Sequence, residues 1–257
     1  MFVDSHCHLT FPELLERLPE IRAAMAAAQV ERALCICTTL EEFALVHRLA
    51  LEHSNFWASA GVHPDNEVET EPSEGDLRRL AALPRVVAIG ETGLDYYRLN
   101  GRTIAEMEWQ RERFRVHIRA AKACKRPLIV HTRSAAQDTL AILNEEGAGA
   151  AGGVFHCFTE TMQVARGALD LGFYVSFSGI ITFRNASELR EVARFVPLER
   201  CLIETDSPYL APVPRRGKIN DPSLLPFVAR QLAEVKGVPV ETVARATSDN
   251  FDALFKP

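Results

Sequence analysis

The stretch FVDSHCH, residues 2–8, is the first of a series of short apolar runs with the character of β-strands, and this series indicates the fold. In an extended strand, side chains alternate between the two faces, so His6 and His8 point the same way and Cys7 points the other. Segments of helical period separate each run from the next. The eight strand candidates are FVDSHCH (2–8), ALCICT (33–38), FWASAGV (56–62), VVAIGET (86–92), PLIVHT (127–132), GGVFHCF (152–158), FYVSFS (173–178) and CLIETD (201–206).

Strands that alternate with helices predict parallel βα units, and eight such units predict a single closed (βα)8 TIM barrel. The length of 257 residues is enough for two average domains, but it is also the usual length of one such barrel. The chain contains no Gly/Ser-rich linker, low-complexity tract or internal repeat, so we expect one domain over residues 1–257. The alternative, an open doubly wound sheet, lacks the GxGxxG motif that usually follows its first strand.

The composition, with 47% hydrophobic and 25% charged residues, is typical of a soluble globular enzyme. The net charge of −5 argues against a sequence-specific binder of duplex DNA, but it allows an enzyme that binds a few phosphates through a local cluster. No apolar run is long enough to span a membrane, and the N-terminus lacks the layout of a signal peptide. We therefore expect a cytoplasmic protein with no membrane partner and no obligatory protein partner.

The six cysteines predict no disulfide framework, because the chain is long and carries no export signal. Cys35 and Cys37 lie in the apolar run RALCICTTL (32–40), so both thiols face one side of a buried strand. A redox or zinc pair is one interpretation. Packing of small side chains is the commoner outcome for a CxC motif inside a β-run.

Metal-capable side chains occupy the carboxyl ends of five predicted strands, the end at which barrel enzymes place their chemistry. A single buried histidine is more often hydrogen-bonded to a carbonyl group than bound to a metal. Four imidazoles and two carboxylates directed at one small volume, however, would be an unsatisfied polar cluster without a cation. The six residues are His6, His8, Glu91, His131, His156 and Asp206.

The number of donors predicts two ions, since one catalytic zinc takes only three or four protein ligands. We expect Glu91 to bridge the two ions. His6, His8 and Asp206 would complete the first site, and His131 and His156 would complete the second. Two ions about 3.5–4 Å apart can generate hydroxide and stabilise both oxygens of a displacement.

Seven ordered motifs resemble the TatD family of metal-dependent deoxyribonucleases, which belongs to the amidohydrolase-like superfamily of metal-dependent hydrolases. The similarity extends from Phe2 to the TSDNFDALF tail (247–255). One departure is Ser134, where many members carry an acidic residue, and it lies outside the six ligand candidates. The motifs are SHCHL (5–9), AGVHP (60–64), AIGETGLDYY (88–97), RPLIVHTR (126–133), GVFHCF (153–158), SFSGIITF (176–183) and ETDSPYLAPVPRRGK (204–218).

The resemblance implies a metal-dependent DNase, with 3′-5′ exonuclease-like action on single-stranded DNA or strand ends and a role in DNA repair. It also implies that the ligand set falls on the six residues given above. We expect Asp206 to act as the general base for the attacking water and Glu91 to hold the two ions together. Imidazole-rich sites suit zinc, manganese, nickel or similar ions, whereas magnesium or manganese would support turnover.

Further residues at the same ends of the strands are candidates for contacts with substrate. His63 would bind phosphate or the leaving group, unless it forms only a structural hydrogen bond before Pro64. Glu204 lies two residues before Asp206 and is expected to support the ligands rather than bind metal. The loop with Asp95, Tyr96 and Tyr97 offers aromatic rings, of which we select Tyr96 for stacking on a base, the alternative being packing of the loop itself.

The loop APVPRRGKIN (211–220) is the only compact basic loop, and it follows the last predicted strand. Two prolines stiffen it, so we expect its cations to bind phosphate groups of the substrate. Arg133 and Arg184 are weaker candidates for the same task. The charges of the helical segment EWQRERFRVHIR (108–119) are expected to form an outer solvated face. The cations of the loop are Arg215, Arg216 and Lys218.

Two other functions fit parts of this pattern. An amidohydrolase or esterase that acts on a small amide, lactone or ester would use the same dinuclear hydroxide, although the basic loop favours phosphate. A non-enzymatic binding module would not need a complete set of metal ligands.

Overall fold

The computed structural model describes all residues from 1 to 257 and contains one sheet of eight parallel strands in the sequential order β1 to β8. The sheet forms a nearly closed barrel, because β8 meets β1 through a bridge between Cys7 and Ser207 and the Asp206 N–H donates to the carbonyl oxygen of His6, 3.0 Å away. The predicted eight-stranded barrel is confirmed. The strands are β1 (Phe2–Cys7), β2 (Val30–Cys35), β3 (Phe56–Ala60), β4 (Val86–Asp95), β5 (Leu128–Arg133), β6 (Gly153–Phe155), β7 (Tyr174–Phe177) and β8 (Cys201–Ile203).

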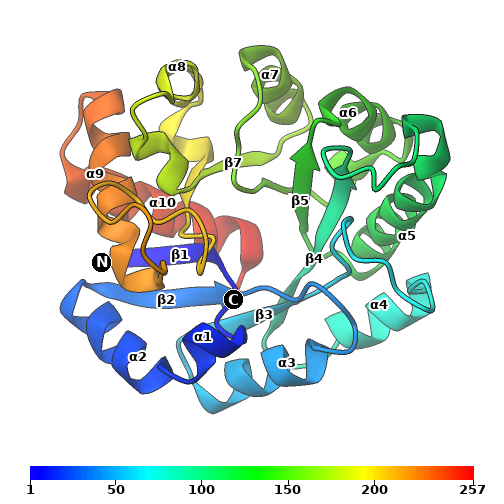
Figure 1. The fold of residues 1–257 in the computed structure, drawn as a ribbon, viewed down its shortest axis with the longest axis horizontal. Helices are drawn as coiled ribbons and strands as arrows, with labels where there is room; N and C mark the ends of the chain where they lie inside the picture. The colour runs from blue at the N-terminus through cyan, green and yellow to red at the C-terminus, as the bar shows by residue number, and fades with distance from the viewer.

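Helices surround the strands (Figure 1). No helix is both long and apolar enough to cross a membrane. The α-helices are α1 (Pro12–Leu15), α2 (Leu18–Ala27), α3 (Phe43–Glu52), α4 (Glu74–Ala81), α5 (Glu108–Cys124), α6 (Ala136–Glu145), α7 (Met162–Asp170), α8 (Ser187–Phe195), α9 (Leu225–Lys236) and α10 (Val240–Phe255). Short 3₁₀ turns are η1 (Ile104–Met107), η2 (Ala148–Ala150), η3 (Gly179–Thr182), η4 (Leu198–Arg200) and η5 (Pro222–Leu224).

Local sequence signals explain several helix boundaries. Pro12 begins α1, where its missing N–H leaves no hydrogen bond unmade. Ser73 precedes α4 and forms a capping box with Asp76, in which each side chain accepts a hydrogen bond from the other residue's backbone N–H. Gly237 ends α9 with a φ of +66°, a conformation that glycine adopts without strain.

Two strands have no more than half of their predicted length, and both stop just before residues of the polar centre. β6 ends at Phe155 rather than at 158, and β8 ends at Ile203 rather than at 206. Beyond these points Cys157 has a φ of +42° and Asp206 a φ of +54°. This left-handed backbone is incompatible with an extended strand, so neither strand can reach its predicted end.

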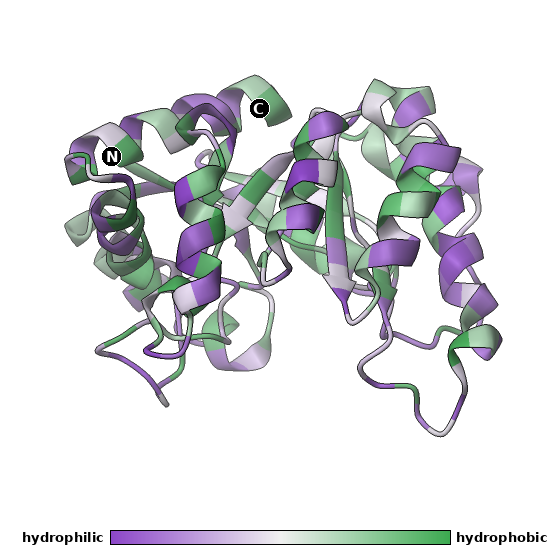
Figure 2. Ribbon diagram, turned by 90° about the horizontal axis from the view of Figure 1, so that it is seen from above, coloured by the Kyte–Doolittle hydropathy of each residue, from purple (hydrophilic) through white to green (hydrophobic).

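Apolar side chains fill both sides of the sheet except at its carboxyl end. A cluster of 59 buried residues packs the strands against the helices, and the buried Cys35 and Cys37 belong to it as small core residues. All six cysteines are free. A second cluster of 11 residues brings Phe251 and Phe255 of α10 against inward-facing strand side chains such as Trp57. Figure 2 shows hydrophobic residues concentrated in the strands and on the helix faces that meet them.

Candidate metal centre

Glu91, on β4, lies at the middle of a cluster of imidazoles at the carboxyl end of the barrel. Its Oε2 lies 3.2 Å from His6 Nε2 and 4.0 Å from His8 Nε2. Its Oε1 lies 2.7 Å from His156 Nε2 and 3.2 Å from His131 Nδ1. The two oxygens of one carboxylate therefore face two separate pairs of histidines, an arrangement suited to a carboxylate that bridges two cations.

Asp206 completes the group around His6 and His8. Its Oδ1 lies 3.6 Å from His6 Nε2 and 3.4 Å from His8 Nε2. The left-handed backbone of Asp206 directs its carboxylate towards these rings, and aspartate tolerates this conformation better than most residues. The structure thus brings all six ligand candidates from the sequence into one cluster.

His63, expected from the sequence to contact substrate, lies directly beside Glu91 of the cluster. Its Nε2 is 3.4 Å from Glu91 Oε1, and burial lowers its pKa to about 3, so the ring is neutral and can donate a lone pair. Three groups of residues have donor atoms within 4.8 Å of one another: His6 with His156 and Asp206, His6 with His8 and Glu91, and His63 with Glu91 and His131.

Two glycines bring β4 and β5 together at this point. Gly90 and Gly93 have φ angles of +146° and +139°, a region that residues with a Cβ rarely adopt. A Cβ on Gly93 would lie 1.9 Å from the carbonyl oxygen of His131, closer than any real contact allows. The GETG motif therefore places Glu91 beside His131, because only glycine permits this approach of the two strands.

The donor set fits a cation in two further respects. His6 Nε2, the ring nitrogen that faces Glu91 and Asp206, is buried without a hydrogen-bond partner. An unpaired buried polar atom costs about 1–3 kcal/mol, which coordination to a metal would remove. Nitrogen and carboxylate donors together are those that zinc, manganese and related ions accept.

The electrostatics of the cluster keep both carboxylates ionised. Burial alone would raise the pKa of Glu91, but the positive charge of the neighbouring His156 and the hydrogen bond with His131 outweigh burial and hold this pKa well below its usual range. Burial likewise opposes ionisation of Asp206, and the hydrogen bond with His8 together with the charge of His156 lowers its pKa. The two groups are thus in the form that binds cations.

Two carboxylates behind the cluster orient its histidines. Glu204 Oε1 lies 3.3 Å from His156 Nδ1 and accepts a hydrogen bond from the Cys157 N–H, 2.7 Å away. Asp95 Oδ2 lies 3.1 Å from His131 Nε2. A carboxylate on the far ring nitrogen is the usual support of a metal-bound histidine. Glu204 has the supporting position expected from the sequence. The role of Asp95 was missed, although its spacing of four residues from Glu91 puts both on one face of the strand.

A third carboxylate, Asp4, was also missed. It is fully buried and accepts hydrogen bonds from the Thr205 N–H (3.0 Å), the Thr205 hydroxyl (2.6 Å) and the His6 N–H (3.2 Å). Burial raises its pKa to about 7. Asp4 connects the segments that carry His6 and Asp206, and its position two residues before His6 was the available signal.

The expectation for Tyr96 needs correction. Its side chain is 7% exposed, and its hydroxyl donates to Asp138 (2.8 Å) and accepts from Arg111 (2.9 Å), so the ring is not available to stack on a base. The adjacent Tyr97 is 62% exposed instead. Strand β4 extends to Asp95, three residues further than predicted, and this extension decides which tyrosine turns into the core.

A pocket of about 690 Å³ opens above the cluster. Its floor carries five of the six ligand candidates as well as His63. Arg215, Arg216 and Lys218 lie on the exposed loop beyond β8 but do not line the pocket; the guanidinium of Arg216 lies 3.7 Å from the centroid of the Phe183 ring. The walls of the pocket include Phe11, Arg98, Arg133, Ile180, Tyr209 and Leu210.

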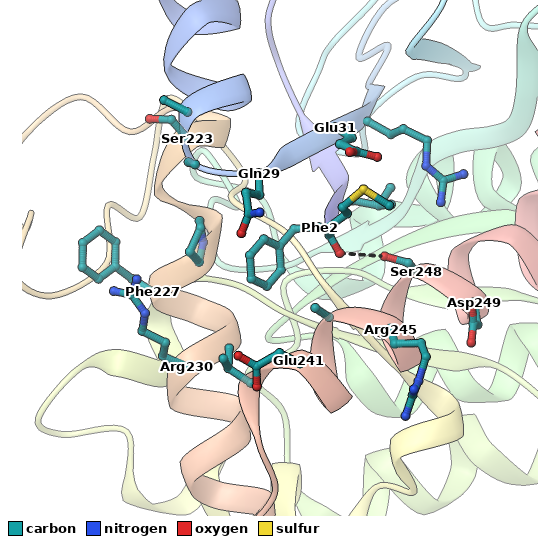
Figure 3. Close-up of a pocket in the computed structure, with 18 of the residues that line it drawn as sticks. Phe2, Gln29, Glu31, Ser223, Phe227, Arg230, Glu241, Arg245, Ser248 and Asp249 are labelled. Atoms are coloured by element: carbon teal, nitrogen blue, oxygen red, sulfur yellow. Dashed lines mark hydrogen bonds between the residues drawn. The ribbon is translucent and has the colours of Figure 1, made fainter.

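A second cavity, of about 740 Å³, lies near the amino ends of β1 and β2, beside α9 and α10 (Figure 3). Its polar groups include the paired Arg32 and Asp252, and Ser248 Oγ, which donates to the carbonyl oxygen of Met1, 3.4 Å away. None of the three convergent groups of metal-capable donors lies there. The chemistry of this chain is therefore assigned to the pocket at the carboxyl end.

A βα barrel with a His/Glu/Asp cluster at the carboxyl ends of its strands is the architecture of a metal-dependent hydrolase. The family model described as "TatD related DNase" matches residues 3–256, and the chain belongs to this family. It is a TatD-family metal-dependent hydrolase.

Relatives and solved structures support this assignment over the whole chain. The "uncharacterized metal-dependent hydrolase YcfH" of Escherichia coli strain K12 is 50% identical over 256 residues, which cover 98% of this chain and 95% of the relative. The "3'-5' ssDNA/RNA exonuclease TatD" of Citrobacter rodentium is 34% identical and covers 98% of this chain and 97% of its own. The crystal structure of YJJV, a TatD homolog from Escherichia coli K12, has a TM-score of 0.92 at 29% identity and covers 100% of this chain and 98% of its own.

Proposed function

We propose that this chain is a deoxyribonuclease that removes nucleotides from single-stranded DNA or strand ends in the 3′-to-5′ direction. The observation that carries the proposal is the orientation of Glu91, whose two oxygens face two separate pairs of histidines beneath an open pocket. The name of the Citrobacter rodentium relative supports the substrate and the direction.

Six side chains would hold two divalent ions. His6, His8 and Asp206 lie around the first position. His131 and His156 lie at the other oxygen of Glu91 with His63 beside them, and His156 is also within reach of His6 and Asp206. Glu91 belongs to both. When bound, such ions lower the pKa of water and polarise phosphoryl oxygens.

Asp206 is the residue proposed to take the proton from the attacking water. Its carboxylate is ionised and lines the pocket, so it can face both the attacking oxygen and the substrate. His63 also lines the pocket as a neutral ring, which makes it the candidate contact for the phosphate or the leaving group.

Phosphodiesters are favoured over amides or esters by the cations around the pocket. Arg98 and Arg133 line it, the latter with its guanidinium on the ring of Tyr97. Arg215, Arg216 and Lys218 are exposed on the loop beyond β8, outside the pocket lining. Cations placed in this way recognise phosphate rather than a neutral carbonyl. The pocket has the volume of a small-molecule site, which suits a strand end rather than paired duplex.

Digestion of end-labelled DNA tests the proposal. The chelated protein is reloaded with zinc, manganese, nickel or magnesium and incubated with single-stranded DNA, duplex DNA and RNA labelled at the 3′ or 5′ end. We expect loss of the 3′ label first, and a ladder of shortened 5′-labelled products. Turnover of a lactone, ester or amide panel without shortening of any DNA would replace the proposal by the amidohydrolase alternative.

A further inference from the structure

The pocket above the metal cluster has two walls of different chemistry. One wall, here called the aromatic wall, consists of Phe11, Ile180, Tyr209 and Leu210, which follow β1, β7 and β8. The other, the cationic wall, consists of Arg98 and Arg133 at the ends of β4 and β5. In an eight-stranded barrel, β4 and β5 lie across the axis from β8 and β1, so the metal cluster lies between the two walls.

The aromatic wall is continuous with a metal-ligand candidate. The ring of Phe11 stacks on that of His8 with centroids 5.0 Å apart and planes 28° apart. The Tyr209 ring meets Phe11 edge to face at 6.1 Å, and its side chain is 56% exposed. A flat ligand placed on this wall would therefore lie directly beside the metal cluster.

Backbone contacts fix the aromatic wall relative to Asp206. The Tyr209 N–H donates to the carbonyl oxygen of Asp206, 3.0 Å away. The buried Asn220 donates from Nδ2 to the carbonyl oxygens of Thr205 (2.9 Å) and Tyr209 (2.7 Å). Gly179 meets the carbonyl oxygen of Leu210 so closely that a Cβ would lie 1.9 Å from it. The wall is thus preorganised rather than a free loop.

The cationic wall offers one guanidinium that is not held in an ion pair. Arg98 is paired with Asp65, with 3.3 Å between Nη1 and Oδ2. Arg133 forms no ion pair, and its guanidinium lies 3.7 Å from the centroid of the exposed Tyr97 ring. Such stacking holds a guanidinium in place while its N–H groups stay free for an anion.

We infer that the two walls form a nucleotide subsite, an inference that rests on the proposed nuclease activity. The base of a nucleoside bonded to the scissile phosphate stacks on Tyr209 and Phe11, and the next phosphate along the strand binds Arg133. Flat apolar rings and anions alternate along a nucleic acid strand, and here an aromatic surface and a free cation lie on opposite sides of the metal cluster. Stacking of this kind accepts every base, so the subsite selects single strands without reading sequence.

The role of Tyr209 is tested by assaying each Tyr209 variant on normal and on abasic substrates. Single-stranded oligonucleotides carry a tetrahydrofuran residue on one side or the other of the terminal phosphodiester. Tyr209→Ala is expected to raise KM for the normal strand about tenfold with kcat nearly unchanged, whereas Tyr209→Phe keeps the ring and behaves like the wild type. One of the two abasic strands should abolish the difference between Tyr209→Ala and the wild type. Equal effects on the normal strand and both abasic strands, or no effect on any, would overturn the assignment of the base.

Arg133 is tested by neutralising the phosphate that it is assigned to bind. Arg133→Gln should weaken cleavage of the normal strand about tenfold but have no effect on a strand with a neutral methylphosphonate at that position. Arg200→Gln is a matched control, because its guanidinium lies 4.9 Å from the Tyr174 ring near the amino end of β7, and it should not change KM. An undiminished effect of Arg133→Gln on the neutral strand would contradict the assignment.

The two proposals fail in different ways. If the wild-type protein cleaves no DNA with any metal, the nuclease function and the subsite are both wrong. If the wild-type protein cleaves DNA but the modified strands never remove the difference between variant and wild type, only the subsite is wrong. Unchanged thermal midpoints for Tyr209→Ala and Arg133→Gln would show that the exposed variants fold normally.

Discussion

Asp206 combines an unusual backbone with a chemical task. Its φ of +54° lies in a region that asparagine and aspartate enter more readily than other residues with a Cβ. Its N–H donates to the backbone carbonyl oxygen of His6, and its carboxylate faces the rings of His6 and His8. Asparagine can therefore replace aspartate without changing the fold, which separates the charge from the geometry.

Asp206→Asn is expected to lower kcat for DNA cleavage by about 10²–10⁴-fold, because the amide cannot accept the proton of the attacking water. The circular dichroism spectrum should match that of the wild type. Asp206→Ala should lower kcat similarly and also lower the thermal midpoint, since alanine tolerates the left-handed backbone less well. A kcat for Asp206→Asn within twofold of the wild type would contradict the role of general base.

Glu91→Gln tests the bridging position. A neutral amide loses the charge that both ions would share, so we expect the metal content measured by mass spectrometry to fall from two ions per chain to one or fewer. Glu31→Gln is the control, because Glu31 lines the cavity near the amino ends of the strands and should leave the metal content unchanged. Two ions per chain in Glu91→Gln would exclude the bridge.

At the level of single residues, the sequence was sufficient to predict where the metal-ligand candidates on the strands point, but not which side chains of the following loops are buried. His6 and His8 share a face because strand geometry requires it, whatever the rest of the fold does. The choice between Tyr96 and Tyr97 depends on where β4 ends, and strand ends are decided by contacts with distant segments. The support of His131 by Asp95 needs both strands to be in place.

Helix α5 has a polar inner face, contrary to the expectation that its charges form only an outer solvated surface. Gln110, Arg113 and His117 are all buried. Arg113 donates from Nε and Nη2 to the Glu71 carboxylate (2.6 Å each) and from Nη1 to the carbonyl oxygen of His63 (3.1 Å). Gln110 accepts from the Asp95 N–H (3.0 Å). This face of α5 therefore positions the segments that carry His63 and Asp95.

His117 makes the same helix sensitive to acid. Its Nδ1–H donates to the carbonyl oxygen of Arg113 (2.8 Å), and its Nε2 accepts from the Val62 N–H (3.0 Å). Protonation of the ring would put an N–H on Nε2, directly against the Val62 N–H donor. Burial lowers its pKa from the unfolded value of 6.5 to about 4. The stability that comes from the neutral ring is therefore complete above pH 6.5 and is lost as the pH falls towards 4.

His117→Gln removes this titration while keeping an acceptor. The contribution of His117 to the free energy of unfolding should decrease by about 3 kcal/mol between pH 7 and pH 4. Urea unfolding at several pH values measures it as the difference between the wild type and the variant. If this difference stays constant across the range, His117 is not the titrating group.

Amphipathic patterns explain why the inner face of α5 was missed. A helical period assigns arginine and glutamine to solvent because their burial is costly without partners. The partners of Arg113 lie 42 to 50 residues away in the chain, so no local pattern reveals them.

In the molecule as a whole, hydrophobic packing and the polar centre occupy different ends of the barrel. Phe251 and Phe255 pack among inward-facing side chains, whereas the carboxyl end carries the charged cluster. The alternation of elements was enough to predict eight parallel strands in order. The sequence did not predict the lengths of β6 and β8, because left-handed residues at Cys157 and Asp206 keep these strands from extending to their predicted ends.

This separation predicts how the protein responds to removal of metal. Chelation should leave the far-ultraviolet circular dichroism spectrum unchanged, because both apolar clusters remain packed. The thermal midpoint should fall and recover when zinc or manganese is added, since a ligand that binds only the folded state stabilises it. An identical midpoint with and without metal would indicate that the cluster does not bind these ions.

The closure of the barrel has a consequence for what a bound ion does beyond chemistry. His6 lies in β1 and Asp206 follows β8, and the neighbouring pair Asp4 and Thr205 is separated by 201 residues of chain. An ion held by His6 and Asp206 would cross-link the first and last strands of the barrel, β1 and β8, in the way a disulfide closes a long loop. Amide hydrogens along β1 and β8 should then exchange faster than those of β3 to β5 once the ion leaves. The cofactor of the reaction would thus also stabilise the closure of the barrel.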